Sequence, residues 1–263
     1  MSSSKVLVIL SGGQDSTTVL YWAKKKFDEV HSVTFDYGQR HQIEIEAAET
    51  ISKLAGVASH ECINIQGAMK STSPLLSDNA LEKYTSAQQM EAVIGNRREL
   101  TFVPLRNMLF LNIAANRAEV MGITNLATGV CQMDNANYPD CRGTFIDAAQ
   151  QAMNMALGAD LGQSPPIVIH TPLMYLSKAE TVKLAYELPD CWKALAYSHT
   201  SYDGKYPPTD MNHANVLRAQ GFEEAGLPDP LVLRAVHEGL MHAPKTANYS
   251  AKALKKAEGY VRS

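Results

Sequence analysis

The stretch VLVILSGGQDSTTVLYWAKKK, residues 6–26, decides the fold. Lys5–Leu10 is a short run rich in Val, Leu and Ile, which predicts a buried parallel strand. From Thr17 to Lys26, apolar residues gather on one side and lysines on the other, which predicts a helix. Two glycines join the strand to the helix, where backbone N–H groups can face an anion. The sequence therefore predicts a strand, a glycine turn and a helix that together form an anion site.

A purely structural glycine turn is the alternative for this stretch. The turn carries more hydroxyl and carboxylate groups than one helix cap requires: Ser11, Asp15, Ser16, Thr17 and Thr18. It matches neither the G-x-x-x-x-G-K-[ST] phosphate loop nor G-x-G-x-x-G. The order S-G-G-x-D-S resembles instead the pyrophosphate loop of the ATP pyrophosphatase superfamily. That resemblance implies that ATP and its pyrophosphate are bound by Leu10, Ser11, Gly12, Gly13, Gln14, Asp15, Ser16, Thr17, Thr18 and, later in the chain, Gly129.

Length and composition indicate one large α/β domain or a domain with an added lobe, since the chain has 263 residues, of which 45% are hydrophobic. The sequence has no apolar run of about 20 residues, so we expect no membrane span. The four cysteines form no C-x-x-C pair, which favours a reducing cytoplasm. A net charge of −3 argues against direct nucleic-acid binding, which favours a basic surface.

Strands and helices alternate along the chain at the spacing of βαβ units. Expected strands are Lys5–Leu10, Glu29–Phe35, Glu61–Ile65, Asn125–Val130 and Ile167–Thr171. Expected helices are Thr17–Lys26, Gln42–Leu54, Ala87–Ile94, Asn107–Val120, Thr144–Leu157, Ser177–Glu187, Ala214–Ala225 and Pro230–Met241. We predict an α/β fold with a doubly wound parallel sheet, an ATP-binding domain at 1–190 and a small helical C-terminal lobe at 191–263. Ligands bind at the carboxyl ends of the strands in such sheets.

Four further segments rich in polar residues are expected on the side of the sheet where the strands have their carboxyl ends. Each has a structural alternative: an ordinary βα loop, a helix start, or a surface lysine. Arg106 and Lys178 lie in the first turns of helices, where positive charge opposes the helix dipole and indicates an anion nearby. Cys131 and Cys141 are weak candidates for metal ligands, and buried thiols are the better interpretation. The candidates for substrate binding are Asp36, Tyr37, Gln39, Arg40, His41, Asn107, Asp134, Tyr138, Asp140 and Arg142.

Five motifs together, SGGQDSTT, FDYGQRH, FVPxRN, TGVCxxDxxxYPDCR and TPLMxLxKAET, resemble the QueC family of 7-cyano-7-deazaguanine synthases from about Lys5 to Gly221. The resemblance implies a ligase that forms C–N bonds and makes 7-cyano-7-deazaguanine from 7-carboxy-7-deazaguanine, ammonia and ATP. It also implies a homodimer in the cytoplasm. In that scheme Asp15, Lys178 and Arg106 are catalytic: Asp15 holds Mg²⁺, and the two basic side chains neutralise phosphate charge.

One departure from the family concerns zinc. The family carries four zinc-binding cysteines close to a segment that corresponds here to Leu217–Gly221. Counted from that segment, the ligand positions fall on Ser201, Thr209, Asn212 and Asn215. None of these is cysteine, so we expect no zinc. We expect hydrogen bonds and tyrosine packing in its place, with Thr209 or Asp210 capping the helix that leads to Leu217.

Other functions remain open at this level. A superfamily amidotransferase such as NAD synthetase shares the glycine loop but not the later motifs. A tRNA-thiolating enzyme would favour a basic surface, which the chain lacks. A diverged relative could stop at the amide or transfer the activated deazaguanine to another acceptor, and a nucleotide-binding module would bind ATP without turnover.

Overall fold

A five-stranded sheet forms the centre of the protein. The structure is a computed structural model that describes residues 3–40, 42–133 and 137–255. The strands are β1 (Lys5–Ile9), β2 (Glu29–Asp36), β3 (Ser59–Asn64), β4 (Asn125–Ala127) and β5 (Val168–His170). Their order is β3-β2-β1-β4-β5, and every neighbouring pair is parallel. The predicted doubly wound α/β fold is confirmed.

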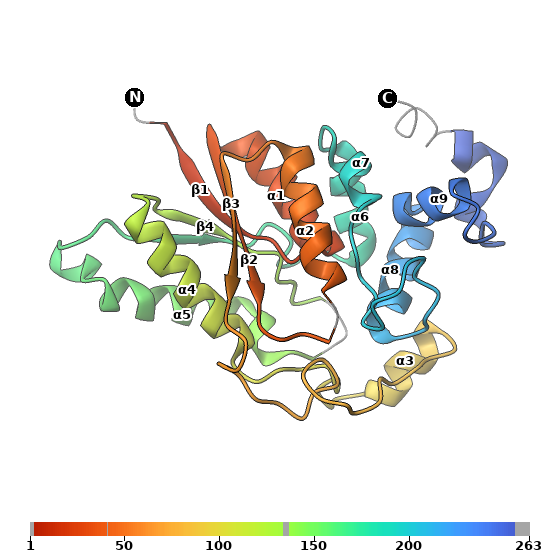
Figure 1. The fold of residues 1–263 in the computed structure, drawn as a ribbon, viewed down its shortest axis with the longest axis horizontal. Helices are drawn as coiled ribbons and strands as arrows, with labels where there is room; N and C mark the ends of the chain where they lie inside the picture. The colour runs from red at the N-terminus through yellow and green to blue at the C-terminus, as the bar shows by residue number, and fades with distance from the viewer. Residues whose placement is uncertain (1–2, 41, 134–136, 256–263) are drawn as a thin grey trace.

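Helices cover both faces of the sheet, as Figure 1 shows. Along β1, Val6 and Val8 pack into one apolar cluster, and Leu7 and Ile9 pack into the other, because successive side chains of a strand point to opposite faces. Helices on the first face are α1 (Gln14–Lys26), α2 (Ile43–Ala55), α6 (Lys178–Glu187) and α7 (Cys191–Leu195). Helices on the second face are α4 (Arg106–Val120) and α5 (Gly143–Ala156). Both faces of β1 are therefore buried, as its unbroken apolar run predicts.

The chain changes direction across the sheet between β1 and β4. From β1 it proceeds to β2 and β3 on one side, and it then returns to place β4 and β5 on the other side. At such a switch point the connections leave in opposite directions, so a crevice opens beyond the carboxyl ends of the two central strands. The glycine loop follows β1 and therefore lies at this crevice.

The C-terminal part packs against the helices of the first face. Its elements are α8 (His213–Ala225), α9 (Pro230–His237) and a 3₁₀ turn at Ala247–Tyr249. Trp192 and Phe222 have ring centroids 5.8 Å apart and share the apolar cluster of β1. A buried ion pair joins Arg218 to Asp229, with a 2.6 Å distance between Nε and Oδ2. The boundary between residues 190 and 191 remains a prediction.

Several boundaries differ from those expected. β4 ends at Ala127 rather than Val130, since the chain then leaves the sheet towards the N-terminal turn of α1. α1 begins at Gln14 rather than Thr17, so Asp15 and Ser16 belong to its first turn. α7 was not expected at all. A short helix α3 (Ala87–Ile94) and 3₁₀ turns at Pro139–Cys141 and Ala159–Leu161 complete the described elements. None of the described helices is both long and apolar enough to cross a membrane.

Candidate active site

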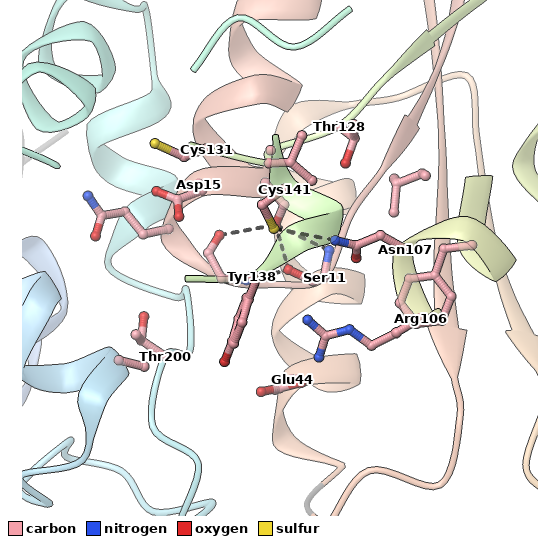
Figure 2. A pocket seen from close by; sticks show the side chains of 18 of the residues that line it. Ser11, Asp15, Glu44, Arg106, Asn107, Thr128, Cys131, Tyr138, Cys141 and Thr200 are labelled. Carbon is pink, nitrogen blue, oxygen red and sulfur yellow. Dashed lines mark hydrogen bonds between the residues drawn. The ribbon is translucent and has the colours of Figure 1, made fainter. Parts of the chain in front are cut away.

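A cavity of about 690 Å³ lies at the switch point. It is lined by the end of β1 and the glycine loop, by the segment after β4, and by the first turns of α2, α4 and α6. The C-terminal part contributes Thr200, Tyr202 and Arg218 to the lining. Figure 2 shows the labelled side chains around this space. Residues from most of the motifs that the sequence singles out therefore line one cavity.

Glycines allow the backbone to pack closely beneath the cavity. Gly12 has a φ of +80°, and a Cβ atom there would lie 2.3 Å from the carbonyl oxygen of Glu44. A Cβ on Gly129 would lie 3.0 Å from the backbone nitrogen of Ser16. The loop after β4 thus reaches the first turn of α1, and neither position can accept a side chain without a backbone shift.

The N-terminus of α1 opens towards the cavity. Its N-cap is Gly13, which provides no side chain to bond the first N–H groups. Ser11, Gly13, Gln14, Asp15 and Ser16 line the cavity. An anion can therefore be bound there by backbone N–H groups and by the helix dipole.

Two predicted ATP-binding residues point elsewhere. Thr17 and Thr18 are fully buried. Their hydroxyls donate to the carbonyl oxygens of Gly13 and Gln14, at 2.7 and 2.9 Å. These bonds to the preceding turn are a common use of threonine inside helices. Both threonines support the loop from within rather than lining the cavity.

Lys178 and Asp15 form an ion pair at the edge of the cavity. Lys178 Nζ lies 2.8 Å from Asp15 Oδ2 and 3.1 Å from Oδ1. The Lys178 side chain is 10% exposed. Its stem passes Gly221 of α8, where an added Cβ would lie 2.3 Å from Lys178 Cγ. The lysine is therefore held in place by helix packing as well as by charge.

The C-terminal part also contacts the glycine loop directly. The backbone N–H of His199 donates to the carbonyl oxygen of Gly12, at 2.8 Å. Arg218 donates to the hydroxyl of Thr200, at 2.7 Å, and both residues line the cavity. This part of the chain therefore forms one wall of the site.

Arg106 lies beside Glu44 and away from Asp15 (Figure 2). Its guanidinium carbon is 6.0 Å from the centre of the Tyr37 ring. Burial raises the pKa of Tyr37 to about 12 and that of Glu44 to about 7, and the positive charge of Arg106 opposes both shifts. Burial also raises the pKa values of Tyr138 and Tyr202 at this end. The cavity thus has two ends: a phosphate end, formed by the N-terminus of α1 with Asp15 and Lys178, and an aromatic end. Glu44 was not among the residues predicted for the site.

The start of α4 is fixed by Asp140. Its carboxylate accepts from the backbone N–H of Asn107 at 3.3 Å, and the Asn107 amide donates to the Asp140 carbonyl at 3.0 Å. The same amide donates to Cys141 Sγ at 3.4 Å, as Figure 2 shows. Asp140 is buried, and burial raises its pKa. It does not line the cavity, whereas Asn107, Tyr138 and Arg142 do. Asp140 thus provides a carboxylate at this helix N-terminus, and the positive charge of Arg106 opposes the rise in its pKa.

The remaining predicted substrate residues do not all reach the cavity. Tyr37 and Gln39 line the cavity. Asp36 does not line it: its carboxylate accepts from the Gln66 amide at 2.8 Å and from the Gly38 N–H at 3.2 Å. Arg40 is exposed and borders only a small recess beside the cavity. His41 and Asp134 lie outside the described residues.

The four positions that correspond to zinc ligands do not suit a metal. The Ser201 hydroxyl accepts from the Asn215 and Asn212 amides, at 2.9 and 3.3 Å, and donates to Asp203 at 2.5 Å. Thr209 is exposed. Neutral hydroxyls and amides that already bond one another are poor zinc ligands. In the described part of the chain, no three His, Cys, Asp or Glu side chains gather as a metal site.

The capping residue of α8 differs from the prediction. Asn212, not Asp210 or Thr209, is its N-cap and accepts from the N–H of Asn215 at 3.1 Å. Tyr206 packs on Arg234, with the guanidinium carbon 4.5 Å from the ring centre, and Tyr202 lines the cavity. Neither tyrosine hydrogen-bonds to the Ser201 cluster, so hydrogen bonds among Ser201, Asn212 and Asn215 hold this segment.

Comparison with known proteins gives a consistent result. The family described as "Queuosine biosynthesis protein QueC" matches residues 5–226. A "7-cyano-7-deazaguanine synthase" of Gloeobacter violaceus is 47% identical over 229 residues, which cover 86% of this chain and 95% of that protein. Proteins of the same name from Laribacter hongkongensis and Chromobacterium violaceum are 47% and 45% identical, and the matches cover 87% and 90% of this chain and 94% and 97% of theirs. Because the family match covers most of the chain and the glycine loop lies at the switch point of a parallel sheet, the chain belongs to the QueC family.

Proposed function

We propose that the protein converts 7-carboxy-7-deazaguanine and ammonia to 7-cyano-7-deazaguanine at the expense of ATP. The proposal extends to this chain the activity that its relatives are named for. The observation that carries it is the arrangement of the cavity. An uncapped helix N-terminus and the Lys178–Asp15 pair lie at one end, and an aromatic end with Arg106 and Glu44 adjoins it. Such a cavity can bind the phosphates of a nucleoside triphosphate at one end and a flat, polar base at the other.

The reaction requires two activations. A carboxylate is a poor acylating agent because its leaving group is oxide. Attack of the carboxylate on the α-phosphorus of ATP releases pyrophosphate and gives a mixed anhydride with AMP. Ammonia then attacks the carbonyl carbon, AMP leaves, and the amide forms. A second ATP activates the amide oxygen in the same way, and loss of AMP and protons leaves the nitrile.

The residues at the phosphate end would act by positioning and charge stabilisation. Backbone N–H groups from Ser11 to Ser16 would bind the pyrophosphate as it leaves. Lys178 would neutralise charge on the phosphates, since its ammonium group already lies at the cavity edge. Gln14 could donate a hydrogen bond to a phosphate oxygen: the residue is 4% exposed, and its amide nitrogen has no hydrogen-bond acceptor among the described residues.

Magnesium belongs to this proposal. Asp15 is the acidic side chain that lines the phosphate end in the described part of the chain. One carboxylate fits a Mg²⁺ ion that is bound mainly by substrate phosphates and water, which is a usual arrangement for this ion. Asp15 would then exchange part of its contact with Lys178 for the metal. The ion would supply further neutralisation of phosphate charge.

The test is the mass of the product. The protein is incubated with 7-carboxy-7-deazaguanine, ammonium and MgATP. The deazaguanine products are then separated by chromatography and identified by mass spectrometry. We expect the nitrile, formed only when all three substrates are present. An amide that accumulates without nitrile would identify a diverged enzyme, and unchanged acid with bound ATP would identify a binding module. We also propose a reducing compartment, the cytoplasm, since no disulfide joins any of the four cysteines, all of which lie in the described residues.

A further inference from the structure

Glu44 has a carboxylate in the cavity that the proposed reaction does not yet use. It lies in the first turn of α2 and points into the space beside Arg106 (Figure 2). Within the part of the chain that the structure describes, no side chain donates a hydrogen bond to it. A carboxylate in a partly buried site needs donors, and burial without them raises its pKa, here to about 7. The missing donors point to a ligand.

Arg106 supplies the complementary chemistry next to it. It begins α4, and its planar guanidinium carries several N–H donors and no acceptor. The Asp140 carboxylate accepts from the Asn107 N–H at this helix start, a role that a guanidinium, which has no acceptor, could not fill. Aromatic rings of Tyr37, Tyr138 and Tyr202 line the same end of the cavity. The site therefore offers an acceptor and a donor side by side, among flat apolar surfaces.

One class of base matches this pattern. The six-membered ring of a guanine-type base has a carbonyl oxygen next to a ring N–H and an amino group. A carboxylate can accept from both N–H groups while a guanidinium donates to the oxygen. Adenine has the reverse pattern on this edge. Its amino group would face the guanidinium, and its ring nitrogen lone pair would face the carboxylate. The site should thus favour guanine-type bases and reject adenine by unpaired polar groups.

We propose that Glu44 and Arg106 recognise this edge of the deazaguanine substrate, with Glu44 as the residue that selects for the amino group. The inference rests on the proposed function and names the substrate subsite of the same cavity. Binding the six-membered ring at this end leaves the carboxyl group on the five-membered ring able to face the phosphate end. Arg106 then binds the base instead of neutralising phosphate, which is the role that its sequence position alone favoured.

The experiment combines a protein variant with a substrate variant. Glu44→Gln keeps the shape of the side chain but presents an amide that cannot accept both hydrogen bonds. We expect the KM for 7-carboxy-7-deazaguanine to rise on the order of 100-fold, because one charge-assisted hydrogen bond is replaced by two facing donors and the other loses its charge. The KM for ATP should not change. Glu46→Gln is the matched control, since Glu46 lies on the same helix turn but is exposed, and it should leave both KM values unchanged.

The substrate variant is the analogue that lacks the amino group. The unmodified protein should lose about 100-fold or more in kcat/KM on this analogue, since the carboxylate oxygen that faces the amine is left without a donor. Glu44→Gln should discriminate between the two substrates by less than about tenfold, because the group that reads the amine is gone. A structural role for Glu44 would lower thermal stability and leave this discrimination intact.

The outcomes separate this inference from the proposed function. If the unmodified protein makes nitrile and Glu44→Gln retains its substrate KM, the inference is wrong and the function stands. A rise in the KM for ATP alone would place adenine at this end and overturn the inference. If the unmodified protein makes no product, the proposed function fails. Calorimetry with free guanine and adenine then tests the subsite: guanine preference that is lost in Glu44→Gln supports it, and equal binding of the two bases contradicts it.

Discussion

At the scale of single residues, Lys178 is the side chain whose removal should affect chemistry most selectively. It reaches Asp15 from a helix 163 positions further along the chain, and its ammonium group lies where phosphates would bind. We predict that Lys178→Ala lowers kcat on the order of 10²–10³-fold, as loss of one charge-stabilising donor does. Loss of the ion pair and of the packed stem lowers the unfolding midpoint, but the variant should remain fully folded at the assay temperature.

Lys183 provides the control for this substitution. It lies on the same helix and is exposed to solvent. Lys183→Ala should leave turnover and stability unchanged. A near-normal rate in Lys178→Ala would contradict the assignment of Lys178 to the phosphates.

The pH dependence of substrate binding reports on Glu44. Burial raises the pKa of this carboxyl to about 7, and the charged or titratable groups that face it are Arg106, Tyr37 and Tyr202. Below that pH the group is protonated and can accept fewer hydrogen bonds, and above it the carboxylate forms. We therefore predict that substrate affinity rises as pH increases through about 7, and that this step disappears in Glu44→Gln. Titration calorimetry between pH 6 and 8 measures it. An identical step in the variant would assign the titration to another group.

The sequence predicted some site residues and not others, for local reasons. Ser11, Asp15 and Lys178 follow strand ends in recognisable turns, so their place in the cavity could be predicted. Thr17 and Thr18 belong to the same motif, yet their hydroxyls bond the preceding helical turn, which only the backbone geometry reveals. Glu44 was missed because an acidic residue in the first turn of a helix has an ordinary explanation in the helix dipole. Its position eight residues after Asp36, in the same motif region, was the available signal.

At the scale of elements, the segment before α8 depends on hydrogen bonds. The hydroxyl of Ser201 is 1% exposed and joins Asn212, Asn215 and Asp203. We predict that Ser201→Ala destabilises the protein by about 1–3 kcal/mol, because each of the two amides loses one of its two acceptors and keeps only its bond to Asp210. Thr209→Ala, at the exposed position of the four, should change stability by no more than about 0.5 kcal/mol. Chemical denaturation measures both values.

Zinc content checks the same segment independently. If hydrogen bonds take the place of a metal here, purified protein should carry no stoichiometric zinc. Zinc at about one ion per chain that resists chelators and is lost on substitution of His199 or His213 would contradict this account.

The elements themselves were predictable where the apolar pattern is long. β1 has an unbroken apolar run, β2 is rich in the β-branched and aromatic residues that favour strands, and α6 has a capping box between Ser177 and Glu180 that fixes its start. α7 spans only five residues, which is too short for a periodic pattern, and its stability comes from the burial of Trp192 in the shared core. α8 begins at an N-cap that competes with two equally good capping residues nearby, so its capping residue required the structure.

At the scale of the whole molecule, we propose a homodimer, as the family resemblance implies. Apolar residues of α4 and α5 such as Leu111, Ala114 and Met153 are buried in the core of one chain, so they do not form an interface. The exposed apolar side chains Val120, Leu161 and Val168 are better candidates. Light scattering at working concentration should give the mass of two chains, and a monomer mass would reject the dimer.

The central claim is that this cavity activates a carboxylate by transfer of AMP. The direct measurement is the set of nucleotide products released with 7-carboxy-7-deazaguanine, ammonium and MgATP, followed by chromatography and a pyrophosphate assay. We predict AMP and pyrophosphate in equal amounts, released only when the deazaguanine acid is present, with one AMP for the amide step and a second for the nitrile step. Release of ADP and phosphate instead would contradict the account.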